Sequence, residues 1–540
     1  IDGYIISHND EYQNEYTPEC FKRLEYVTGF TGSSGMAVIT KDGQYFWTDG
    51  RYRIQAQKEV PEYKICERDF REVGNLRIGY NPYLFTKVGL AALSKDMVLI
   101  PTAVDLVDEI WNERPKASSK AAYLYPVEYA GMSSEEKLAK VRKEFLGKAK
   151  YLLITEPDSI CWLLNIRGND IEYVAVLLSY MILSENDAIC FTDLSKIPSD
   201  VIAALSHVRF READELQDTL RLIADPIIID PASCALGFAD LISNKIESQN
   251  PCLVLKACKD EVEINYAKER HIKDAVALCE GFAWVQNNPG ITEHEVSVKL
   301  TELRGKQEGY VMDSFPTIAG FRDNGAIIHY RPPENGSKKI EGDGLLLIDS
   351  GAHYFGCTTD VTRVLVFGVP TEEQKKRYTQ VLKGHLALAM AVVPEGAIGG
   401  SLDSLARMHL WKDGVDYAHG TGHGVGNMLS VHEYPRSIWT PQAAMQLRQG
   451  YIISDEPGYY KDGEFGIRIE NLMFVKRSSK KGFLEFEMLT LVPYEKALID
   501  FDMLTKDELD YLGSYNNSIK ERVYPLLSDK AKVWVQAQMG

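Results

Sequence analysis

Short apolar runs separated by turn residues dominate the first half of the chain, and they occur twice in the same order. The first copy reads GYIISHNDEY, LEYVTGFTGSSG and AVITKDGQYFWTDGRY, and the second reads KYLLITEPDSI, CWLLNIRGND and YMILSENDAICFTDLS. Each copy has a strand, a loop, a second strand and a hairpin. This order predicts two related α/β domains, residues 1–122 and 123–256. The alternative is that two unrelated α/β domains show apolar runs at such spacing by chance.

Helical periodicity appears between these copies and again downstream of them. The stretch 133–147, SSEEKLAKVRKEFLG, has the Ser133 and Glu136 spacing of a capping box. Charges and apolar residues alternate at helical period in three further stretches, 256–286, 291–305 with Thr292 as its cap, and 371–393. A tail at 499–540 has the same periodicity, and the remaining residues 257–498 form a third predicted domain.

Residues 345–367, LLLIDSGAHYFGCTTDVTRVLVF, are two apolar runs joined by a glycine-bearing turn, and each run carries one aspartate. Runs joined this closely are expected to pair antiparallel, which brings Asp349 and Asp360 near each other. An ionised carboxylate among Leu and Val side chains is costly to bury unless it is paired, hydrogen-bonded or bound to a cation. The two aspartates therefore indicate a metal site. The alternative is that one caps a turn and the other pairs with Arg363.

Histidines and further carboxylates follow this hairpin. Seven of the eleven histidines lie between His329 and His432, and three of them are in AHGTGHGVGNMLSVHEYP. Two acidic residues stand in turn-rich or β-like settings, Glu456 in YIISDEPGYY and Glu470 in FGIRIENLMFV. Two Asp, one His and two Glu form a mostly oxygen ligand set, which suits a hard divalent ion such as manganese and differs from a thiolate zinc site. Such a set can hold two metal ions that together bind and activate a water molecule.

Glycines at 420, 422, 424 and 426 surround His423 with the spacing GxGxGxG. This spacing matches neither the dinucleotide-binding nor the Walker pattern, so a phosphate-binding loop is not expected. The glycines instead predict that the backbone passes close beside His423.

Composition narrows the classes of partner and the compartment. The 540 residues carry a formal net charge of −17, which argues against binding to nucleic acid or to an anionic membrane. No apolar run reaches the roughly 18 residues of a membrane span. Nine cysteines without a CxxC pair favour a reducing compartment, and we expect a cytoplasmic protein. The first residue is Ile1 rather than Met, so a removed leader that directs the protein to an organelle stays open.

The ordered motifs IDSGA, TTDVTR, HGTGHGVG, EPGYY and GIRIEN resemble the metal-binding series of the pita-bread metallopeptidases. The residues of these motifs are most similar to those of the long, eukaryotic-type X-Pro aminopeptidases (aminopeptidase P). The resemblance implies an α/β (α+β) chain with two homologous N-terminal α/β domains, a pita-bread catalytic domain at 257–498 and a C-terminal helical extension at 499–540. In the family this extension helps to form a homodimer. The alternative is a helical cap on its own catalytic domain.

The resemblance also implies the metal ligands. Asp360 and Glu470 would bridge two divalent ions, for which we expect Mn2+. Asp349 would complete the ligands of one ion, and His423 and Glu456 would hold the other. Glu456 is in addition the candidate that accepts the proton of the attacking water, with pure ligation as the alternative.

Substrate contacts follow from the same resemblance. His329 and His432 would face the peptide and act as catalytic residues that steady the developing oxyanion. The residues implied in substrate binding are Arg51, His329, His419, His423 and His432. Whether Arg51 serves the site of its own chain or that of a neighbouring chain stays open. Arg468 would support the site by holding a ligand carboxylate in place. The alternatives are satisfied structural histidines, an exposed arginine after a hairpin turn for Arg51, and a strand-surface arginine for Arg468.

The implied reaction is hydrolysis of the first peptide bond in peptides whose second residue is proline. Proline makes this bond a tertiary amide without an N–H, so the enzyme needs a pocket shaped for its ring. An X-Pro dipeptidase shares all five ligands, but such enzymes usually carry one N-terminal domain, whereas two precede the catalytic domain here. A second alternative is a pita-bread protein that has lost catalysis and serves as a binding module. Those relatives lack ligands, and all five are present here, so we expect a metal-dependent aminopeptidase.

Overall fold

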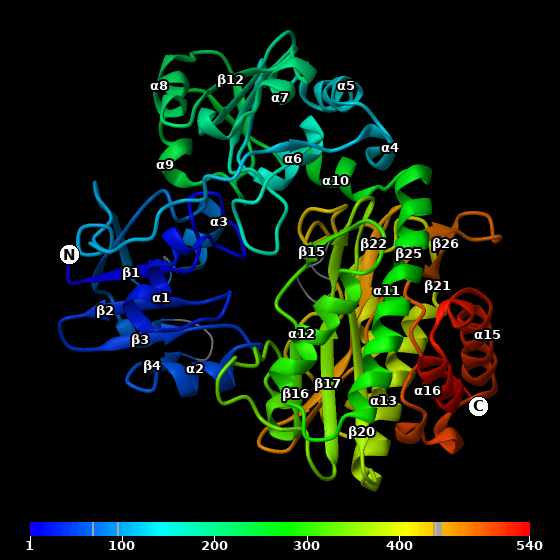
Figure 1. Ribbon diagram of the computed structural model, residues 1–540. Helices are drawn as coiled ribbons and strands as arrows, with labels where there is room; N and C mark the ends of the chain where they lie inside the picture. Colours follow the sequence, from blue (N-terminus) through cyan, green and yellow to red (C-terminus); the bar gives the residue numbers. More distant parts are fainter. Residues whose placement is uncertain (67–69, 94, 96, 436–437, 439–444, 540) are drawn as a thin grey trace. The chain divides into compact units, whose positions relative to one another are not determined.

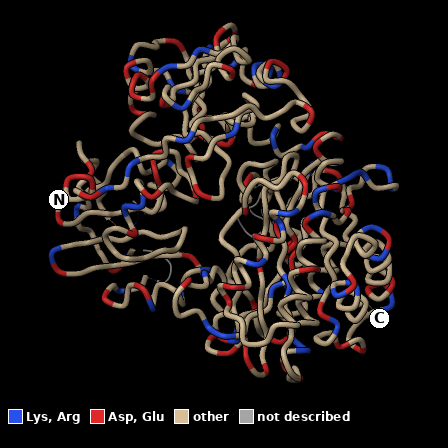
Figure 2. The backbone as a smooth tube through the Cα atoms, viewed as in Figure 1, with Lys and Arg blue, Asp and Glu red and all other residues tan. Residues whose placement is uncertain are grey.

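The chain divides into two units, residues 1–256 and residues 257–540, each with its own hydrophobic cores (Figure 1). The computed structural model describes all residues except 67–69, 94, 96, 436–437, 439–444 and 540. Figure 2 shows Lys and Arg interspersed with Asp and Glu along both units. Among the described residues, none of the helices combines the length and the hydropathy that a bilayer crossing requires.

The first unit contains two six-stranded sheets with the same topology. Their strand orders are β4-β3-β2-β1-β5-β6 and β12-β11-β10-β8-β13-β14. In each sheet the first strand of the copy pairs antiparallel with the next long strand on one side and parallel with a later strand on the other. The strands of the first sheet are β1 (Gly3–Ser7), β2 (Met36–Thr40), β3 (Gln44–Trp47), β4 (Lys64–Cys66), β5 (Arg77–Tyr80) and β6 (Val98–Pro101). Those of the second are β8 (Tyr151–Ile154), β10 (Tyr180–Ser184), β11 (Ala188–Thr192), β12 (Arg209–Glu212), β13 (Ile227–Ile229) and β14 (Lys245–Glu247). The repeat predicted from the apolar runs is confirmed by this shared topology.

Short helices surround the two sheets of the first unit, and a pair of two-residue strands, β7 (Tyr123–Leu124) and β9 (Ile166–Arg167), lies outside them. The capping box predicted at Ser133 is present, because its hydroxyl accepts a hydrogen bond from the backbone N–H of Glu136 and the Glu136 carboxylate accepts one from Ser133. The helices are α1 (Arg23–Thr28), α2 (Arg53–Glu59), α3 (Lys87–Leu93), α4 (Val127–Ala130), α5 (Ser134–Phe145), α6 (Pro157–Leu164), α7 (Ser199–Ala204), α8 (Glu215–Leu222), α9 (Leu236–Ala239) and α10 (Pro251–Ala257).

The second unit opens with two helices, α11 (Glu261–Asn287) and α12 (Glu293–Arg304). The hydroxyl of Thr292 caps α12 as predicted, and Asp260 caps α11. The strands that follow form three- and four-stranded sheets and one hairpin, in the orders β15-β18-β19, β16-β17-β20, β21-β26-β25-β22 and β23-β24. They are β15 (Tyr310–Asp313), β16 (Ile318–Phe321), β17 (Gly344–Ser350), β18 (Ala352–Tyr354), β19 (Cys357–Thr358), β20 (Val361–Phe367), β21 (Val392–Pro394), β22 (Ile452–Asp455), β23 (Gly458–Lys461), β24 (Phe465–Arg468), β25 (Asn471–Arg477) and β26 (Phe483–Met488).

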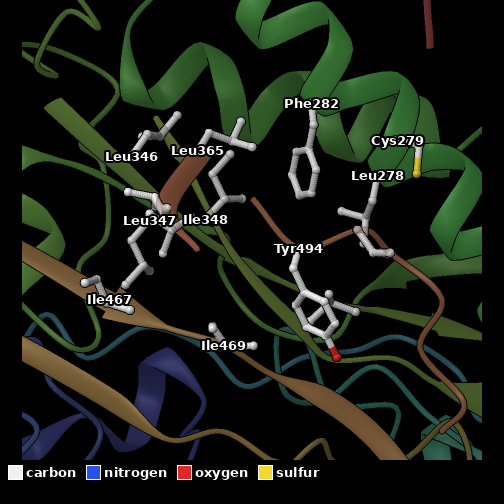
Figure 3. Packing of buried hydrophobic residues seen from close by; sticks show 14 of the residues in the cluster. Leu278, Cys279, Phe282, Leu346, Leu347, Ile348, Leu365, Ile467, Ile469 and Tyr494 are labelled. Atoms are coloured by element: carbon white, nitrogen blue, oxygen red, sulfur yellow. The ribbon is translucent and has the colours of Figure 1, made fainter. Parts of the chain in front are cut away.

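Strand β17 lies in the main core of the second unit and is buried on both faces. Leu346, Leu347 and Ile348 are all at most 1% exposed. In Figure 3, Leu278 and Phe282 project from α11 toward the strands that carry these residues. A strand that is covered on both sides has a continuous apolar sequence instead of an alternating one. This packing fixes the position of the aspartate at the end of the strand.

The helix predicted at 371–393 is shorter than its periodicity suggests. Helix α13 (Glu372–Ala389) begins directly after its cap, Thr371, and α14 (Gly399–Trp411) follows. Residues Val392–Pro394 form strand β21, which pairs antiparallel with β26. The backbone hydrogen bonds to β26 replace those of a further helical turn, so tertiary pairing overrides the local helical pattern here.

The C-terminal tail is helical, as predicted, with α15 (Lys506–Arg522) and α16 (Asp529–Met539). Trp534 of α16 is buried and packs edge to face on Phe282 of α11, with ring centroids 5.7 Å apart. The carboxylate of Glu280, also on α11, accepts hydrogen bonds from the backbone N–H and the hydroxyl of Ser528. The tail thus packs on its own unit, which is what the cap alternative requires, and the homodimer stays a prediction.

Buried His271 on α11 predicts how stability depends on pH. Its Nδ1 lies 2.7 Å from the carbonyl oxygen of Ala267, its Nε2 has no hydrogen-bond partner, and burial lowers its pKa to about 4. The unfolded chain takes up this proton below about pH 6.5, so the stability from a neutral His271 is present above that pH and is lost as the pH falls toward 4. We expect His271 to reduce the free energy of unfolding by about 2 kcal/mol between pH 7 and pH 5.

The measurement is urea unfolding in the presence of a chelator at both pH values, for the unchanged chain and for His271→Leu. The variant is expected to lose less stability on acidification than the unchanged chain. His294→Leu, which replaces a half-buried histidine on α12, is the matched control. An equal loss in the unchanged chain and His271→Leu would contradict the prediction.

Candidate metal centre

The antiparallel pair of β17 and β20 brings the two predicted aspartates together, with the short strands β18 and β19 in the connection between them. The strands pair antiparallel as expected, with Asp349 opposite Thr362 and Ser350 opposite Val361. Asp360 immediately precedes β20 and therefore lies beside the end of β17. Asp349 is 7% and Asp360 3% exposed. Both carboxylates are held in the apolar interior that their sequence surroundings indicate.

Glu456 and Glu470 enter from a second strand pair. Strands β22 and β25 pair antiparallel with Asp455 opposite Asn471, so Glu456 leaves one strand at the point where Glu470 leads into the other. The backbone N–H of Glu470 donates to the carbonyl of Thr362, which connects this pair to β20. The four carboxylates thus come from the ends of two strand pairs that meet at one point.

His423 approaches the carboxylates with its Nε2 atom. Its Nδ1 lies 2.9 Å from the carbonyl oxygen of Gly424, and because a carbonyl only accepts, Nδ1 carries the proton. The Nε2 atom lies 3.3 Å from Glu456 Oε1 and 3.5 Å from Asp360 Oδ2. A neutral ring with a lone pair on Nε2 is the form in which histidine binds a metal ion.

Three groups of these side chains place one donor atom each within 4.8 Å of the others: Asp349, Asp360 and Glu470; His423, Glu456 and Glu470; and Asp360, His423 and His432. The first two groups together contain all five predicted ligands. They have Glu470 in common, which suits two neighbouring cation positions with a shared carboxylate. His432 lies against His423, with ring centroids 4.4 Å apart.

The donor set fits divalent cations. Burial and then the neighbouring Asp349 and Glu456 carboxylates raise the pKa of Asp360 well above its ordinary value, and burial and then Asp360 and Glu456 raise that of Glu470. One carboxylate oxygen each of Asp349 and Asp360 is buried without a hydrogen-bond partner. Four carboxylates this close repel one another when ionised, and cations between them would remove both the repulsion and the missing contacts.

Arg468 on β24 connects the carboxylates to the candidate substrate residues. Its guanidinium donates to Asp349 Oδ2 at 2.6 Å, to the hydroxyl of Tyr460 at 2.7 Å and to the carbonyl of Ile328 at 3.3 Å. Tyr460 in turn lies 2.8 Å from His419 Nε2. Arg468 is 1% exposed, so the strand-surface alternative is wrong. The carboxylate that it contacts is Asp349.

The remaining predicted residues lie outside the three ligand groups. His329 follows Ile328, whose carbonyl Arg468 binds, and His419 is connected through Tyr460. Arg51 belongs to the first unit, where its guanidinium forms ion pairs with Glu15 at 3.0 Å and Asp49 at 2.8 Å. It is thus a partly buried, paired arginine within its own unit.

Arg363 does not play the part that the turn-and-salt-bridge alternative gives it. It is buried and donates to the carbonyls of Glu470 at 2.7 Å, Val492 at 2.8 Å and Pro493 at 3.0 Å. Its other contacts include Asn471 Oδ1 at 2.7 Å. Arg363 therefore fixes the backbone behind Glu470.

Three supporting side chains were missed by the sequence reasoning. The hydroxyl of Thr362 donates to Glu470 Oε2 at 2.7 Å, and that of Ser454 contacts Glu456 Oε1 at 3.2 Å and accepts from the backbone N–H of His423. The third is Tyr460. Thr362 lies in the motif TTDVTR with Asp360, and Tyr460 lies in EPGYY with Glu456. Closeness in sequence to a predicted ligand was therefore the available signal.

The glycines around His423 allow the close backbone packing that their spacing predicts. A Cβ at Gly422 would stand 2.0 Å from the carbonyl oxygen of Ser454, and one at Gly424 would stand 2.4 Å from that of Tyr434. No side chain fits at such distances, so the loop reaches β22 only with glycine at these positions.

Comparison with protein families finds matches along most of the chain. The metallopeptidase family M24 matches residues 266–477, and the C-terminal region of this peptidase family matches 482–539. The creatinase/prolidase N-terminal domain matches twice, at 1–95 and at 113–263.

Individual proteins extend this similarity to the full length. Xaa-Pro aminopeptidase 1 of Dictyostelium discoideum is 38% identical over 100% of this chain and 94% of its own length. The crystal structure of X-prolyl aminopeptidase from Caenorhabditis elegans, described as a cytosolic enzyme with a di-nuclear active site, superimposes with a TM-score of 0.95 at 30% identity and covers 100% of this chain and 95% of its own. The prolidase of Pyrococcus horikoshii shares the fold with a TM-score of 0.54 at 24% identity, and covers only 67% of this chain and 99% of its own.

Proposed function

The chain belongs to metallopeptidase family M24, among its Xaa-Pro aminopeptidases, and we propose that it releases the first residue from peptides with proline in the second position by means of two divalent metal ions. The observation that carries this proposal is the pair of ligand groups that share Glu470. The two relatives described above that match this chain over its full length are both X-Pro aminopeptidases, which favours the aminopeptidase over the dipeptidase.

The five side chains Asp349, Asp360, His423, Glu456 and Glu470 would hold the two ions, and Asp360 and Glu470 would be shared between them. When bound, the ions supply a water molecule acidic enough to act as a nucleophile at neutral pH. We propose Mn2+ as the ion because four of the five donors are carboxylates, which hard divalent ions prefer.

The protein groups position the peptide and move the proton. The side chain of Glu456 is 18% exposed, against 5% for Asp360, so Glu456 is the carboxylate best placed to accept a proton from the attacking water. His329 and His432 face the scissile bond and steady the developing oxyanion. His419, held by Tyr460, and His423 bind the peptide. Arg51, whose guanidinium is paired within the first unit, is a further proposed peptide-binding residue, for the site of its own chain or of a second copy.

The assembly and compartment are part of the same proposal. We propose a homodimer that uses the C-terminal extension, where Leu526 and Val533 are 56% and 72% exposed. All nine cysteines are free thiols, which suits the reducing cytoplasm.

Removing the metals is expected to abolish cleavage of X-Pro bonds. We expect the chain to release free arginine from Arg-Pro-Pro, to leave Arg-Ala-Ala and Gly-Pro intact, and to lose activity with a chelator because no group in the site then acidifies water. Mass spectrometry of the products with Mn2+ or Zn2+ added back is the measurement, and Mn2+ is expected to restore the higher rate. Cleavage of Gly-Pro alone would indicate a dipeptidase, and no metal-dependent cleavage would contradict the proposed function.

A further inference from the structure

A buried carboxylate outside the metal centre, that of Glu293, has contacts that helix capping does not explain. Glu293 is the first residue of α12 and is 0% exposed. The helix start is already capped, because Thr292 and Glu295 form the reciprocal hydrogen bonds of a capping box. Burying a further carboxylate costs free energy unless its oxygens are satisfied. The partners of Glu293 therefore indicate what it is for.

Among the described residues, the hydrogen-bond partners of the Glu293 side chain belong to one segment, residues 321–338. Its Oε1 accepts hydrogen bonds from the backbone N–H of Phe321 at 2.7 Å and from Asn324 Nδ2 at 3.0 Å. Its Oε2 accepts from the hydroxyl of Tyr330 at 2.8 Å, from Asn324 Nδ2 at 3.0 Å and from the backbone N–H of Lys338 at 3.3 Å. The Glu293 side chain thus connects four residues of this segment to the N-terminal end of α12.

The candidate catalytic residue His329 lies inside the tied segment. Tyr330, directly after it, is bound to Glu293 and also contacts Asn324 at 3.0 Å. Ile328, directly before it, offers its carbonyl to Arg468 at 3.3 Å. Both neighbours of His329 are therefore held by hydrogen bonds. Tyr330 is bound to Glu293 at the start of α12, and Ile328 is bound to Arg468, which also binds the Asp349 carboxylate.

We propose that Glu293 is a positioning residue that holds His329 at the substrate, an inference that rests on the proposed function. Without the carboxylate, the N–H groups of Phe321 and Lys338 and the hydroxyl of Tyr330 lose their acceptor. Lys338 stays connected to α12, because its carbonyl accepts from the backbone N–H of Glu293 at 3.0 Å, whereas Tyr330, next to His329, keeps only its contact with Asn324 among the hydrogen bonds described above. A displacement of about 1 Å in a group that contacts the reacting atoms can cost about a hundredfold in rate. The five metal ligands lie on other elements, so the metal centre keeps its shape.

Glu293→Ala is expected to lower kcat for Arg-Pro-Pro by about tenfold to a hundredfold and to leave Mn2+ affinity unchanged. Calorimetric titration of the metal-free chain with Mn2+ measures the affinity without reference to activity. Glu295→Ala is the matched control, since it removes the other half of the cap on the same helix, and among the described residues the hydrogen bonds to its carboxylate come from Thr292. This control is expected to lose stability but to keep its kcat. Glu293→Gln, which retains one acceptor oxygen, is expected to recover part of the rate.

The decisive comparison is made in a chain that lacks the histidine. If Glu293 acts through His329, adding Glu293→Ala to His329→Ala causes no further loss of kcat. Three results would each overturn the inference. The double variant could lose kcat by the product of the two single losses, Glu293→Ala could have the same kcat as Glu295→Ala, or Glu293→Ala could bind Mn2+ more weakly than the unchanged chain. If Glu293→Ala does not fold, Tyr330→Phe takes its place, because it removes a single hydrogen-bond donor to Glu293. Its effect on kcat is then compared in the unchanged chain and in the His329→Ala chain. Absence of Arg-Pro-Pro cleavage by the unchanged chain would overturn the proposed function, and the inference with it.

Discussion

Asp360→Ala is expected to abolish turnover and to release both metal ions while the fold persists. Asp360 belongs to the ligand group with Asp349 and Glu470, and its Oδ2 lies 3.5 Å from Nε2 of His423 in the other group, so its loss affects both cation positions. We expect kcat to fall by at least about a thousandfold, a typical cost of removing one essential catalytic group. Glu470→Ala should behave alike, since Glu470 is common to the two groups that contain all five ligands.

The fold is expected to survive because the metal-free site is under electrostatic strain. Burial and neighbouring carboxylates raise the pKa of Asp360 and Glu470, which means that the site resists carrying all its charges. Removing one carboxylate relieves this repulsion, so the metal-free variant should unfold at the same or a higher urea concentration than the metal-free unchanged chain.

Three measurements check this prediction: metal content per chain by elemental analysis, kcat on Arg-Pro-Pro, and circular dichroism. Asp343→Ala is the matched control, because Asp343 is exposed one residue before β17 and belongs to none of the ligand groups. The control should retain metal and activity. An Asp360→Ala chain that keeps two ions and turns over at the normal rate would show that the site is assigned wrongly.

The strands and helix caps could be predicted because their signals are local. The apolar runs around Asp349 and Asp360 are close enough in sequence to indicate that they pair antiparallel. Thr292 and Thr371 have the spacing of capping boxes, which marks where their helices begin. Helix α13 ends earlier than its periodicity suggests because Val392–Pro394 pairs with β26, which is about ninety residues away in the chain.

The supporting contacts of the site could not be predicted from the same signals. Arg468 was expected to hold a ligand carboxylate, but only the folded chain shows that this carboxylate is Asp349 and that Tyr460 connects the same guanidinium to His419. Glu293 resembles an ordinary acidic residue in the first turn of a helix. Its contacts with 321–338 depend on how α12 packs, which no periodicity encodes.

Arg468→Ala is expected to weaken metal binding and to lower kcat by about ten- to a hundredfold, the usual effect of removing a group that orients a metal ligand. Asp349 Oδ2 would lose its 2.6 Å donor and the Tyr460 hydroxyl its 2.7 Å donor. The positive charge of Arg468 also lowers the pKa of Asp360 and Glu470 against the larger effect of burial. Without it both pKa values rise further, so protons compete more strongly with the metals, and the acid limb of the activity profile should move to higher pH.

Two variants separate the charge of Arg468 from its geometry. Arg468→Lys keeps a cation but not the planar fork that reaches Asp349, Tyr460 and Ile328 together, so it should lose rate while its acid limb stays near that of the unchanged chain. Tyr460→Phe leaves the contact with Asp349 intact and should retain metal affinity, with a smaller loss of rate through His419. The measurements are Mn2+ titration calorimetry and kcat between pH 5 and pH 8. The positive charge of Arg468 also repels metal ions in the site. If this repulsion outweighed the positioning of Asp349, Arg468→Ala would bind Mn2+ more tightly than the unchanged chain. That result would contradict the role assigned to Arg468.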